Sequence, residues 1–276
     1  MSVSGGLHKA FERLGRVKGQ ALQIFLLNQR RWVAPELTGQ AVSEFRRAWE
    51  RAGWIPVAAH DSYLINLASP DPALWVKSLQ SLAAELRRAR ALGIPFLVVH
   101  PGAHVGAGAE AGLRRFVHGL DAAMEEASAE GVRVLVETTA GQGTALGGSF
   151  EEIGWILAHS RHGHRLGVCF DTCHVFASGW DLRTEDSYMT TMEALDRIVG
   201  LGRVAWFHLN DSKTELGSRV DRHAHIGQGR IGLGGFKALL RDPRFQDHPM
   251  VLETPKGPDL REDKRNLARL RCLLTA

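Results

Sequence analysis

Seven short apolar runs alternate with helix-like segments along the chain, and this alternation restricts the fold more than any other feature. The runs are nearly continuous and often β-branched, which is typical of strands buried on both faces of a parallel sheet. Segments with apolar residues at three- and four-residue spacing follow them, as in residues 74–92. This pattern predicts parallel β-α-β units. The runs cover residues 22–27, 55–59, 96–99, 132–136, 166–170, 204–207 and 250–252.

A (β/α)8 TIM barrel in the α/β class fits both the pattern and the length. The chain has 276 residues, 44% of them hydrophobic and 23% charged, and such a barrel typically takes about 250 residues. No low-complexity linker divides the sequence, so we predict one domain over residues 1–276. Seven runs are one fewer than a barrel needs, and the helix pattern at residues 7–16 has no strand before it. We therefore expect the first barrel strand to be missing from this chain.

Composition limits where in the cell the protein is expected and which classes of partner it is expected to bind. No apolar run approaches the ~18 residues needed to span a bilayer, and three cysteines in a chain of this size favour a reducing cytosol. We therefore expect a cytoplasmic protein with no membrane partner. The net charge of +4 is too mild to predict nucleic-acid binding by itself.

Six consecutive runs end in a histidine or a carboxylate. In a TIM barrel the carboxyl ends of all strands point to one face, where active sites lie. Side chains of these types are costly to bury together unless cations hold them. The sequence therefore predicts a metal site built from His60, His100, Glu137, Asp171, His208 and Glu253.

Three more candidates lie in the loops, namely His174, Asp221 and His223. The full set has five histidines and four carboxylates, a mixture of nitrogen and oxygen donors that suits zinc, with manganese as the alternative at one site. Nine ligands are too many for one ion. Three ions fit if one carboxylate bridges two of them.

Long stretches around these residues resemble the endonuclease IV family of abasic-site endonucleases, a zinc-dependent TIM-barrel group that acts in DNA repair. The resemblance runs from about Ser4 to the C-terminus, and the stretches follow the order of the family. They are His60-Asp-Ser-Tyr-Leu-Ile-Asn-Leu, His100-Pro-Gly-Ala-His, Glu137-Thr-Thr-Ala-Gly-Gln-Gly, Asp171-Thr-Cys-His-Val-Phe-Ala-Ser-Gly, His208-Leu-Asn-Asp-Ser-Lys, Gly217-Ser-Arg-Val-Asp-Arg-His and Leu252-Glu-Thr.

The resemblance implies three zinc sites and a set of DNA-contacting residues. His60, His100 and Glu137 would hold the first ion. Glu137, as the bridge, would hold the second with Asp171, His208 and Glu253, and His174, Asp221 and His223 would hold the third. Glu137 and Glu253 would be the catalytic carboxylates. Arg30, Tyr63 and Leu64 would enter the duplex where the abasic nucleotide is flipped out.

The implied activity is hydrolysis of the phosphodiester on the 5′ side of abasic sites in double-stranded DNA. It would leave a 3′-hydroxyl and a 5′-deoxyribose phosphate, and the enzyme would also trim blocked 3′ ends and act as a monomer. The family pattern also bears on the missing strand, because Met1 stands where the family has valine. GTG encodes both valine and a start, so we expect a start placed one strand too late. The alternative is a truncation in which another segment closes the gap.

Two other functions stay open at this point. A metal-dependent sugar isomerase or epimerase uses the same barrel and gathers similar side chains, and a DNA-binding protein without catalysis would keep the DNA-contacting loops. The third ligand set and these loops argue against the sugar enzyme, and the presence of all nine ligands argues against the binding protein without catalysis. The Gly227-Gln-Gly-Arg-Ile-Gly sequence matches a dinucleotide fingerprint but follows no strand, so we expect a flexible loop there. Cys169 and Cys173 are expected to be buried apolar residues, and Cys272 to lie in the core.

Overall fold

The computed structural model describes residues 1–27, 31–33 and 35–275. The chain forms two compact units. The first unit comprises residues 1–136 and 156–167, and the second unit comprises residues 137–155 and 168–276, so that the division falls within a strand, a helix and a second strand. We describe each unit by itself.

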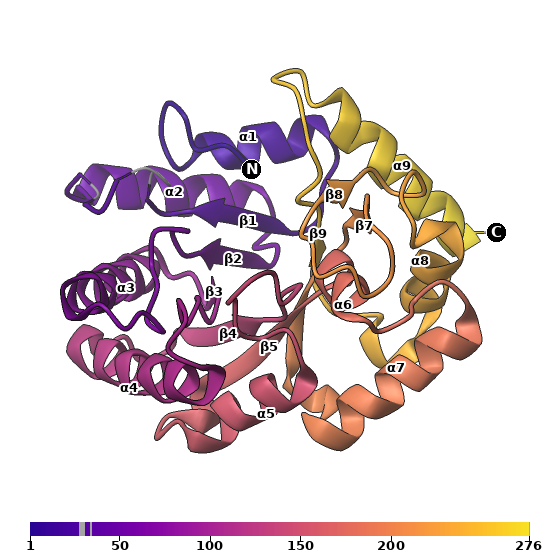
Figure 1. The fold of residues 1–276 in the computed structure, drawn as a ribbon. Coiled ribbons are helices and arrows are strands. Elements are labelled where there is room, and N and C mark those ends of the chain that lie inside the picture. Colours follow the sequence, from indigo (N-terminus) through magenta and orange to yellow (C-terminus); the bar gives the residue numbers. More distant parts are fainter. Residues whose placement is uncertain (28–30, 34, 276) are drawn as a thin grey trace. The chain divides into compact units, whose positions relative to one another are not determined.

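Helices alternate with strands through both units, as Figure 1 shows. The α-helices are α1 Lys9–Arg16, α2 Gly39–Arg51, α3 Pro72–Leu92, α4 Ala109–Ala127, α5 Phe150–His159, α6 Thr172–Ser178, α7 Glu185–Ile198, α8 Gly232–Arg241 and α9 Arg261–Thr275. The strands are β1 Leu22–Phe25, β2 Val57–His60, β3 Phe96–Val99, β4 Arg133–Glu137, β5 Leu166–Asp171, β6 Val204–His208, β7 Asp211–Ser212, β8 His223–Ala224 and β9 Met250–Val251.

All seven predicted strands are present, with ends within two residues of the predicted ones. In the first unit β1, β2, β3 and β4 pair side by side and parallel. In the second unit β6 pairs parallel with β5 on one edge and with β9 on the other. Within the described residues, no strand precedes α1, in agreement with the expected absence of the first barrel strand.

The hairpin of β7 and β8 was not predicted. These two strands are two residues long, pair antiparallel, and match Ser212 with His223. Such short strands carry no alternating hydrophobic pattern that a sequence could show. The hairpin places His223, a predicted ligand, beside the end of β5 in the second unit.

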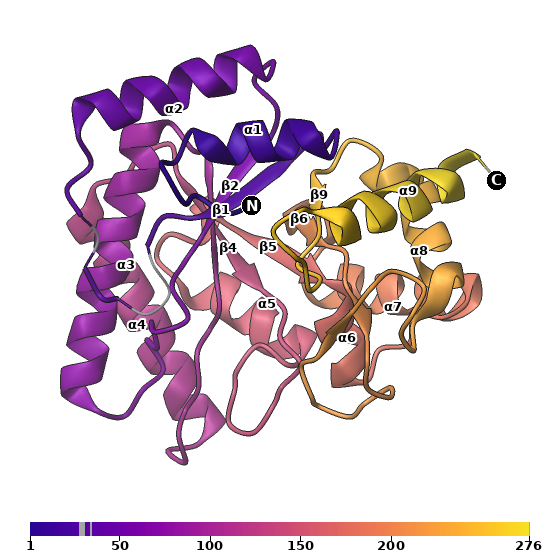
Figure 2. The ribbon, with the colours of Figure 1, turned by 90° about the horizontal axis from the view of Figure 1, so that it is seen from above.

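Local signals explain where the long helix α3 begins and ends. Asp71 accepts backbone N–H bonds from Ala73 and Leu74, and Pro72 occupies the first turn, where no hydrogen bond is lost. Gly93 ends the helix with a φ of 83°, a left-handed conformation that suits glycine. In Figure 2 α3 lies beside α4 on one side of the first unit's strands.

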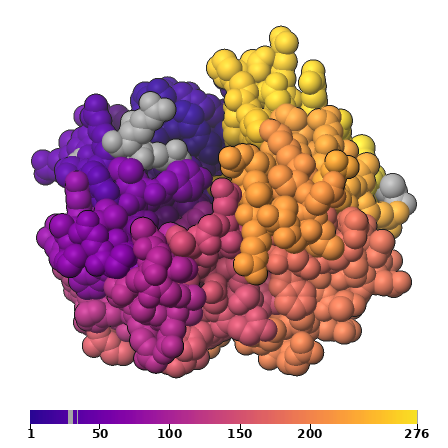
Figure 3. Space-filling view, in the orientation of Figure 1, coloured from indigo at the N-terminus to yellow at the C-terminus, as the bar shows by residue number. Residues whose placement is uncertain are grey.

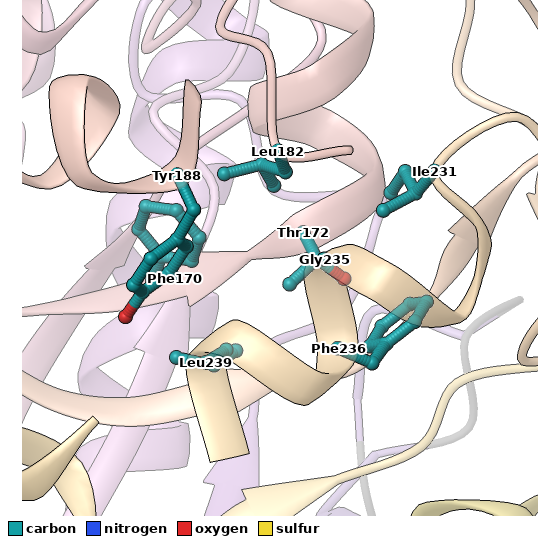
Figure 4. Close-up of a pocket in the computed structure, with 8 residues that line it drawn as sticks. All are labelled: Phe170, Thr172, Leu182, Tyr188, Ile231, Gly235, Phe236 and Leu239. Atoms are coloured by element: carbon teal, nitrogen blue, oxygen red, sulfur yellow. The ribbon is translucent and has the colours of Figure 1, made fainter. Parts of the chain in front are cut away.

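The core of the second unit supports the start of α6. A small apolar pocket with no room for a water molecule lies under Thr172, and Phe170, Tyr188 and Phe236 line it with five other residues (Figure 4). The Tyr188 hydroxyl points away from this pocket and donates to Asp242, 2.8 Å away. Dense packing of this kind holds the α6 backbone in place.

Candidate functional site

Strand ends of the second unit bring predicted ligands together. Glu137, Asp171 and His208 are the last residues of β4, β5 and β6. The register of the parallel sheet places Asp171 opposite His208. All three side chains are fully buried. Glu253 follows two residues after the end of β9 and joins the same group.

The imidazole of His208 faces three carboxylates. Its Nδ1 atom lies 3.0 Å from Glu137 Oε1, 3.2 Å from Glu253 Oε2 and 3.7 Å from Asp171 Oδ2. Burial by itself would lower the pKa of His208, but the charges of Glu137 and Glu253 outweigh it and raise that pKa. Three carboxylates and one imidazole whose donor atoms approach each other so closely form a set that could hold a metal ion.

A second group is formed by His174, Asp221 and His223. Asp221 Oδ2 lies 3.2 Å from His174 Nε2, and Asp221 Oδ1 lies 3.2 Å from His223 Nε2. The two Nε2 atoms are 3.5 Å apart. Donor atoms of three residues therefore converge from α6, from the segment before β8 and from β8 itself.

Both histidines of this group hold their other ring nitrogen against the main chain. His174 Nδ1 lies 2.8 Å from the carbonyl oxygen of Thr138, and His223 Nδ1 lies 3.1 Å from that of Glu253. A carbonyl only accepts, so each Nδ1 carries the proton and donates. When the ring is neutral, each Nε2 then has its lone pair, as in histidines that bind metal ions.

The charges within this second group shift its titration. Burial would lower the pKa of His223, but Asp171 and Asp221 raise it to about 9. Burial would raise the pKa of Asp221, but its bonds to His174 and His223 keep that pKa well below its usual range. Without a metal ion, this group therefore holds protons between the Asp221 carboxylate and the two imidazoles at neutral pH.

Asp171 lies between the two groups. Its Oδ1 accepts the backbone N–H of His174 at 3.0 Å and so caps the start of α6. Its Oδ2 is 3.7 Å from His208 Nδ1 and 3.8 Å from His223 Nε2. One carboxylate therefore fixes a helix with one oxygen and faces both groups with the other.

Three polar residues hold the predicted ligands in place, and this role was not predicted for them from the sequence. Asn210 is fully buried, donates to Asp171 Oδ2 at 2.6 Å and accepts the N–H of Glu253 at 2.8 Å. Thr138 Oγ1 accepts the N–H of Asp171 at 3.0 Å. Gln142 Oε1 accepts the N–H of Asp221 at 3.0 Å. All three lie in the sequence stretches that resemble the endonuclease IV family. This position is the only feature of the sequence that points to these residues.

In the first unit, His60 and His100 lie side by side with Tyr63. The ring centres of His60 and His100 are 5.3 Å apart, and the Tyr63 ring lies 5.7 Å from the first and 5.8 Å from the second. His60 is buried, with Nδ1 2.9 Å from the carbonyl oxygen of Asp61. Tyr63 is 56% exposed and Leu64 is half-buried. Arg30 lies outside the described residues.

The glycine-rich segment at residues 227–232 does not present a nucleotide site. Asp211 is fully buried, and its carboxylate accepts the N–H groups of Gly229 at 2.9 Å and Ile231 at 3.0 Å. The loop that was expected to be flexible is therefore held to Asp211 by its own backbone. Figure 3 shows the orange part of the chain, which includes the β7–β8 connection, at the surface that faces the viewer.

The cysteine predictions have mixed outcomes. Cys169 and Cys173 are buried as predicted. Burial and nearby carboxylates raise the pKa of the Cys169 thiol, and burial raises that of Cys173 to about 12, so both stay protonated. The core position predicted for Cys272 is wrong. It is exposed, because it lies on the outer face of α9, whose buried residues are Asp263, Asn266 and Leu270.

Comparison with known proteins defines the class of the fold first. Residues 12–271 match the family model of xylose isomerase-like TIM barrels, which confirms the predicted fold class. A D-tagatose 3-epimerase-like protein superimposes with a TM-score of 0.74 over 98% of this chain and 96% of its own, but at 17% identity it shows the fold alone. Within the described residues, no helix is long and apolar enough to cross a membrane.

Closer relatives define the family. The chain is 51% identical to a probable endonuclease 4 of Chloroflexus aurantiacus, over 99% of this chain and 96% of that protein, and 45% identical to one of Geobacter sulfurreducens, over 99% and 93%. The crystal structure of endonuclease IV from Thermus thermophilus is 40% identical, with a TM-score of 0.89 over 100% of this chain and 97% of that one. The chain belongs to the endonuclease IV family.

The raised pKa of His223 predicts how the chelator-treated protein responds to pH. The folded-state pKa is about 9 against an ordinary 6.5, so the protonated ring adds stability fully below pH 6.5 and loses it as the pH rises through 9. We expect the melting temperature of the chelated protein to fall by a few degrees between pH 6.5 and pH 9.5. The His223→Gln variant should show a smaller fall, and an equal fall in both proteins would contradict the assignment.

Proposed function

We propose that this chain is a zinc-dependent endonuclease that hydrolyses the phosphodiester on the 5′ side of abasic sites in duplex DNA. The products are a 3′-hydroxyl and a 5′-deoxyribose phosphate, and blocked 3′ ends are further substrates. The proposal includes action as a monomer in the cytoplasm. The observation that carries it is the convergence of seven predicted ligands in the second unit, in a chain of the endonuclease IV family.

The donor set of the second unit fits metal ions. His174 and His223 present Nε2 atoms while their Nδ1 atoms are held by carbonyls, which fixes ring orientation and tautomer as in known metal sites. The carboxylates around His208 supply oxygen donors and negative charge. The nitrogen and carboxylate donors of the proposed ligands match zinc, with manganese as the alternative at one site.

The proposed ligand sets use nine side chains. Glu137, Asp171, His208 and Glu253 hold one ion, and His174, Asp221 and His223 hold another. His60 and His100 of the first unit hold the remaining ion together with Glu137, which thereby serves two ions. Bound zinc would supply charge neutralisation at the phosphate and activation of water for the attack. Glu137 and Glu253 are the proposed catalytic carboxylates.

The protein's own residues prepare the substrate. We propose that Arg30, Tyr63 and Leu64 enter the duplex at the abasic site. The Tyr63 ring is exposed, yet it rests on His60 and His100, so a side chain in the DNA would lie directly beside two ligands. Extruding a nucleotide costs a few kcal/mol, and the cost is least where no base pair must be broken, so this step favours damaged DNA.

Cleavage of a defined duplex tests the proposal. The protein is incubated with a duplex that has one abasic site, with and without a chelator, and the ends of the products are mapped. We expect one cut on the 5′ side, its loss with chelator and its recovery with added zinc. An intact duplex and an epimerisable ketose serve as parallel substrates, and turnover of the ketose alone would favour the sugar epimerase.

Metal content gives an independent measure. Nine ligands with one bridging carboxylate predict close to three metal ions per chain, mainly zinc, in an active preparation. Elemental analysis of the purified protein checks this number. An active preparation with one ion or fewer per chain would exclude the three-ion arrangement.

A further inference from the structure

A tight turn after β3 has an unusual residue at its tip. Residues His104 to Ala107 form a turn closed by a bond of 2.9 Å from the N–H of Ala107 to the carbonyl oxygen of His104. The two central residues, Val105 and Gly106, have φ angles of 46° and 83°. Positive φ at both central positions defines a type I′ turn, in which Asn-Gly is the strongly preferred pair.

Valine is poorly suited to this position. A β-branched side chain with positive φ is a genuine outlier, and conformations of this kind cost free energy that the rest of the structure must supply. Within the described residues, six residues other than glycine have positive φ, and Val105 is the β-branched one among them. Its side chain is also 59% exposed, so burial in the core does not compensate the strain.

Asn66 joins this turn to the loop that carries Tyr63 and Leu64. Its Nδ2 donates to the carbonyl oxygen of Ala103 at 3.0 Å, and its Oδ1 accepts the N–H of Ala103 at 3.0 Å. The same Oδ1 accepts the N–H of Ala68 at 3.1 Å. Gly102 has no room for a Cβ atom because Asn66 Oδ1 occupies that space. The two loops are therefore held together as one surface.

Chain geometry keeps Val105 on the loop that Asn66 joins to the loop of the proposed DNA-contacting residues. It is two residues from Ala103, a reach of at most about 7 Å, and Tyr63 is three residues from Asn66. Tyr63 also packs on His100, the residue from which the Val105 loop starts. Two exposed side chains, one aromatic and one β-branched, thus extend from neighbouring loops that follow the strands of His60 and His100.

We propose that Val105 is a further specificity-determining residue, which packs against the base faces exposed beside an abasic site. This inference rests on the proposed function. An abasic gap leaves the faces of the flanking bases uncovered, whereas in intact DNA they are stacked. An apolar side chain that covers such a surface makes binding more favourable, and it can do so only where the gap exists. Val105 keeps its apolar side chain exposed at a position where a relaxed turn would carry a polar residue.

Two substitutions relieve the strain and remove the contact together, and separate measurements of stability and of duplex preference report on each. Val105→Asn and Val105→Gly both suit a type I′ turn and both remove the apolar side chain. We expect the melting temperature of each variant to rise by roughly 2–4 °C. We also expect the preference for abasic over intact duplex to fall about tenfold, as for the loss of one buried valine.

The preference is measured with the zinc-loaded protein by competition. Unlabelled abasic and intact duplexes are titrated against cleavage of a labelled abasic duplex, and the ratio of the two half-inhibitory concentrations is the preference. Val105→Ile should keep it, because the side chain stays apolar and β-branched. Trp54→Asn is a matched control. Trp54 is 58% exposed with a φ of 53°, but it precedes β2 and so lies at the opposite strand ends from Val105.

The outcomes are distinct. Higher stability with lower preference in Val105→Asn supports the proposal. An unchanged preference in that variant, or equal weakening of both competitors, overturns it while the proposed function stands. A wild-type protein that neither cleaves nor prefers the abasic duplex would instead remove the proposed function itself.

Discussion

Replacing Glu137 with glutamine is expected to lower the turnover number on an abasic-site duplex by roughly 10²–10³-fold, a loss in the range seen when one preorganised electrostatic partner is removed. The Glu137 Oε1 atom lies 3.0 Å from His208 Nδ1 and 3.2 Å from His174 Nδ1, in a fully buried position. An amide has the same shape but no charge, and it cannot balance the cations proposed on either side. DNA binding should fall much less.

The matched control for this variant is Glu152→Gln. Glu152 lies on α5 and accepts the N–H groups of Gly147 and Gly148 at 2.7 and 3.1 Å, so its amide variant also loses a charged hydrogen-bond acceptor, here a part-buried one, but it faces no predicted ligand. Single-turnover cleavage and DNA anisotropy, measured on both variants, separate chemistry from binding. If Glu137→Gln kept more than a tenth of the wild-type turnover, its bridging role would be wrong.

Removing the side chain of Asn210 is expected to weaken metal affinity by about 10–100-fold, although Asn210 itself is no ligand. The Asn210→Ala variant loses the donor to Asp171 Oδ2 and the acceptor for the Glu253 N–H. Both carboxylates then lose a fixed orientation, and the part-buried N–H group of Glu253 loses the Asn210 acceptor. Zinc titration with a competing chelator measures the loss directly.

Asn266→Ala is the control that isolates this effect. Asn266 is equally buried and makes bonds of 2.9 Å to Thr254 Oγ1 and 3.2 Å from the N–H of Ile226, but it contacts no predicted ligand side chain. Both alanine variants should lose stability, and only Asn210→Ala should lose metal. Equal metal affinities in the two variants would show that Asn210 serves the fold alone.

The sequence predicts the strands well because each is a buried apolar run, and burial on both faces leaves a visible pattern. The β7–β8 hairpin escapes prediction since two residues per strand have no period. The candidate ligands are predictable because they end those runs. Asn210, Thr138 and Gln142 are not, because their bonds go to main-chain groups or to a carboxylate distant in sequence. The positive φ of Val105 is likewise a tertiary property.

The carbonyl bonds to His174 and His223 have a consequence for the kinetics of metal uptake. Each ring is held at Nδ1 by a different loop, one following β4 and one following β9. These side chains therefore lose their rotational entropy during folding, so ion binding does not carry this entropy loss a second time. A site ordered in advance can take up an ion without a slow rearrangement, so that removal and return of the proposed zinc ion need not pass through unfolding.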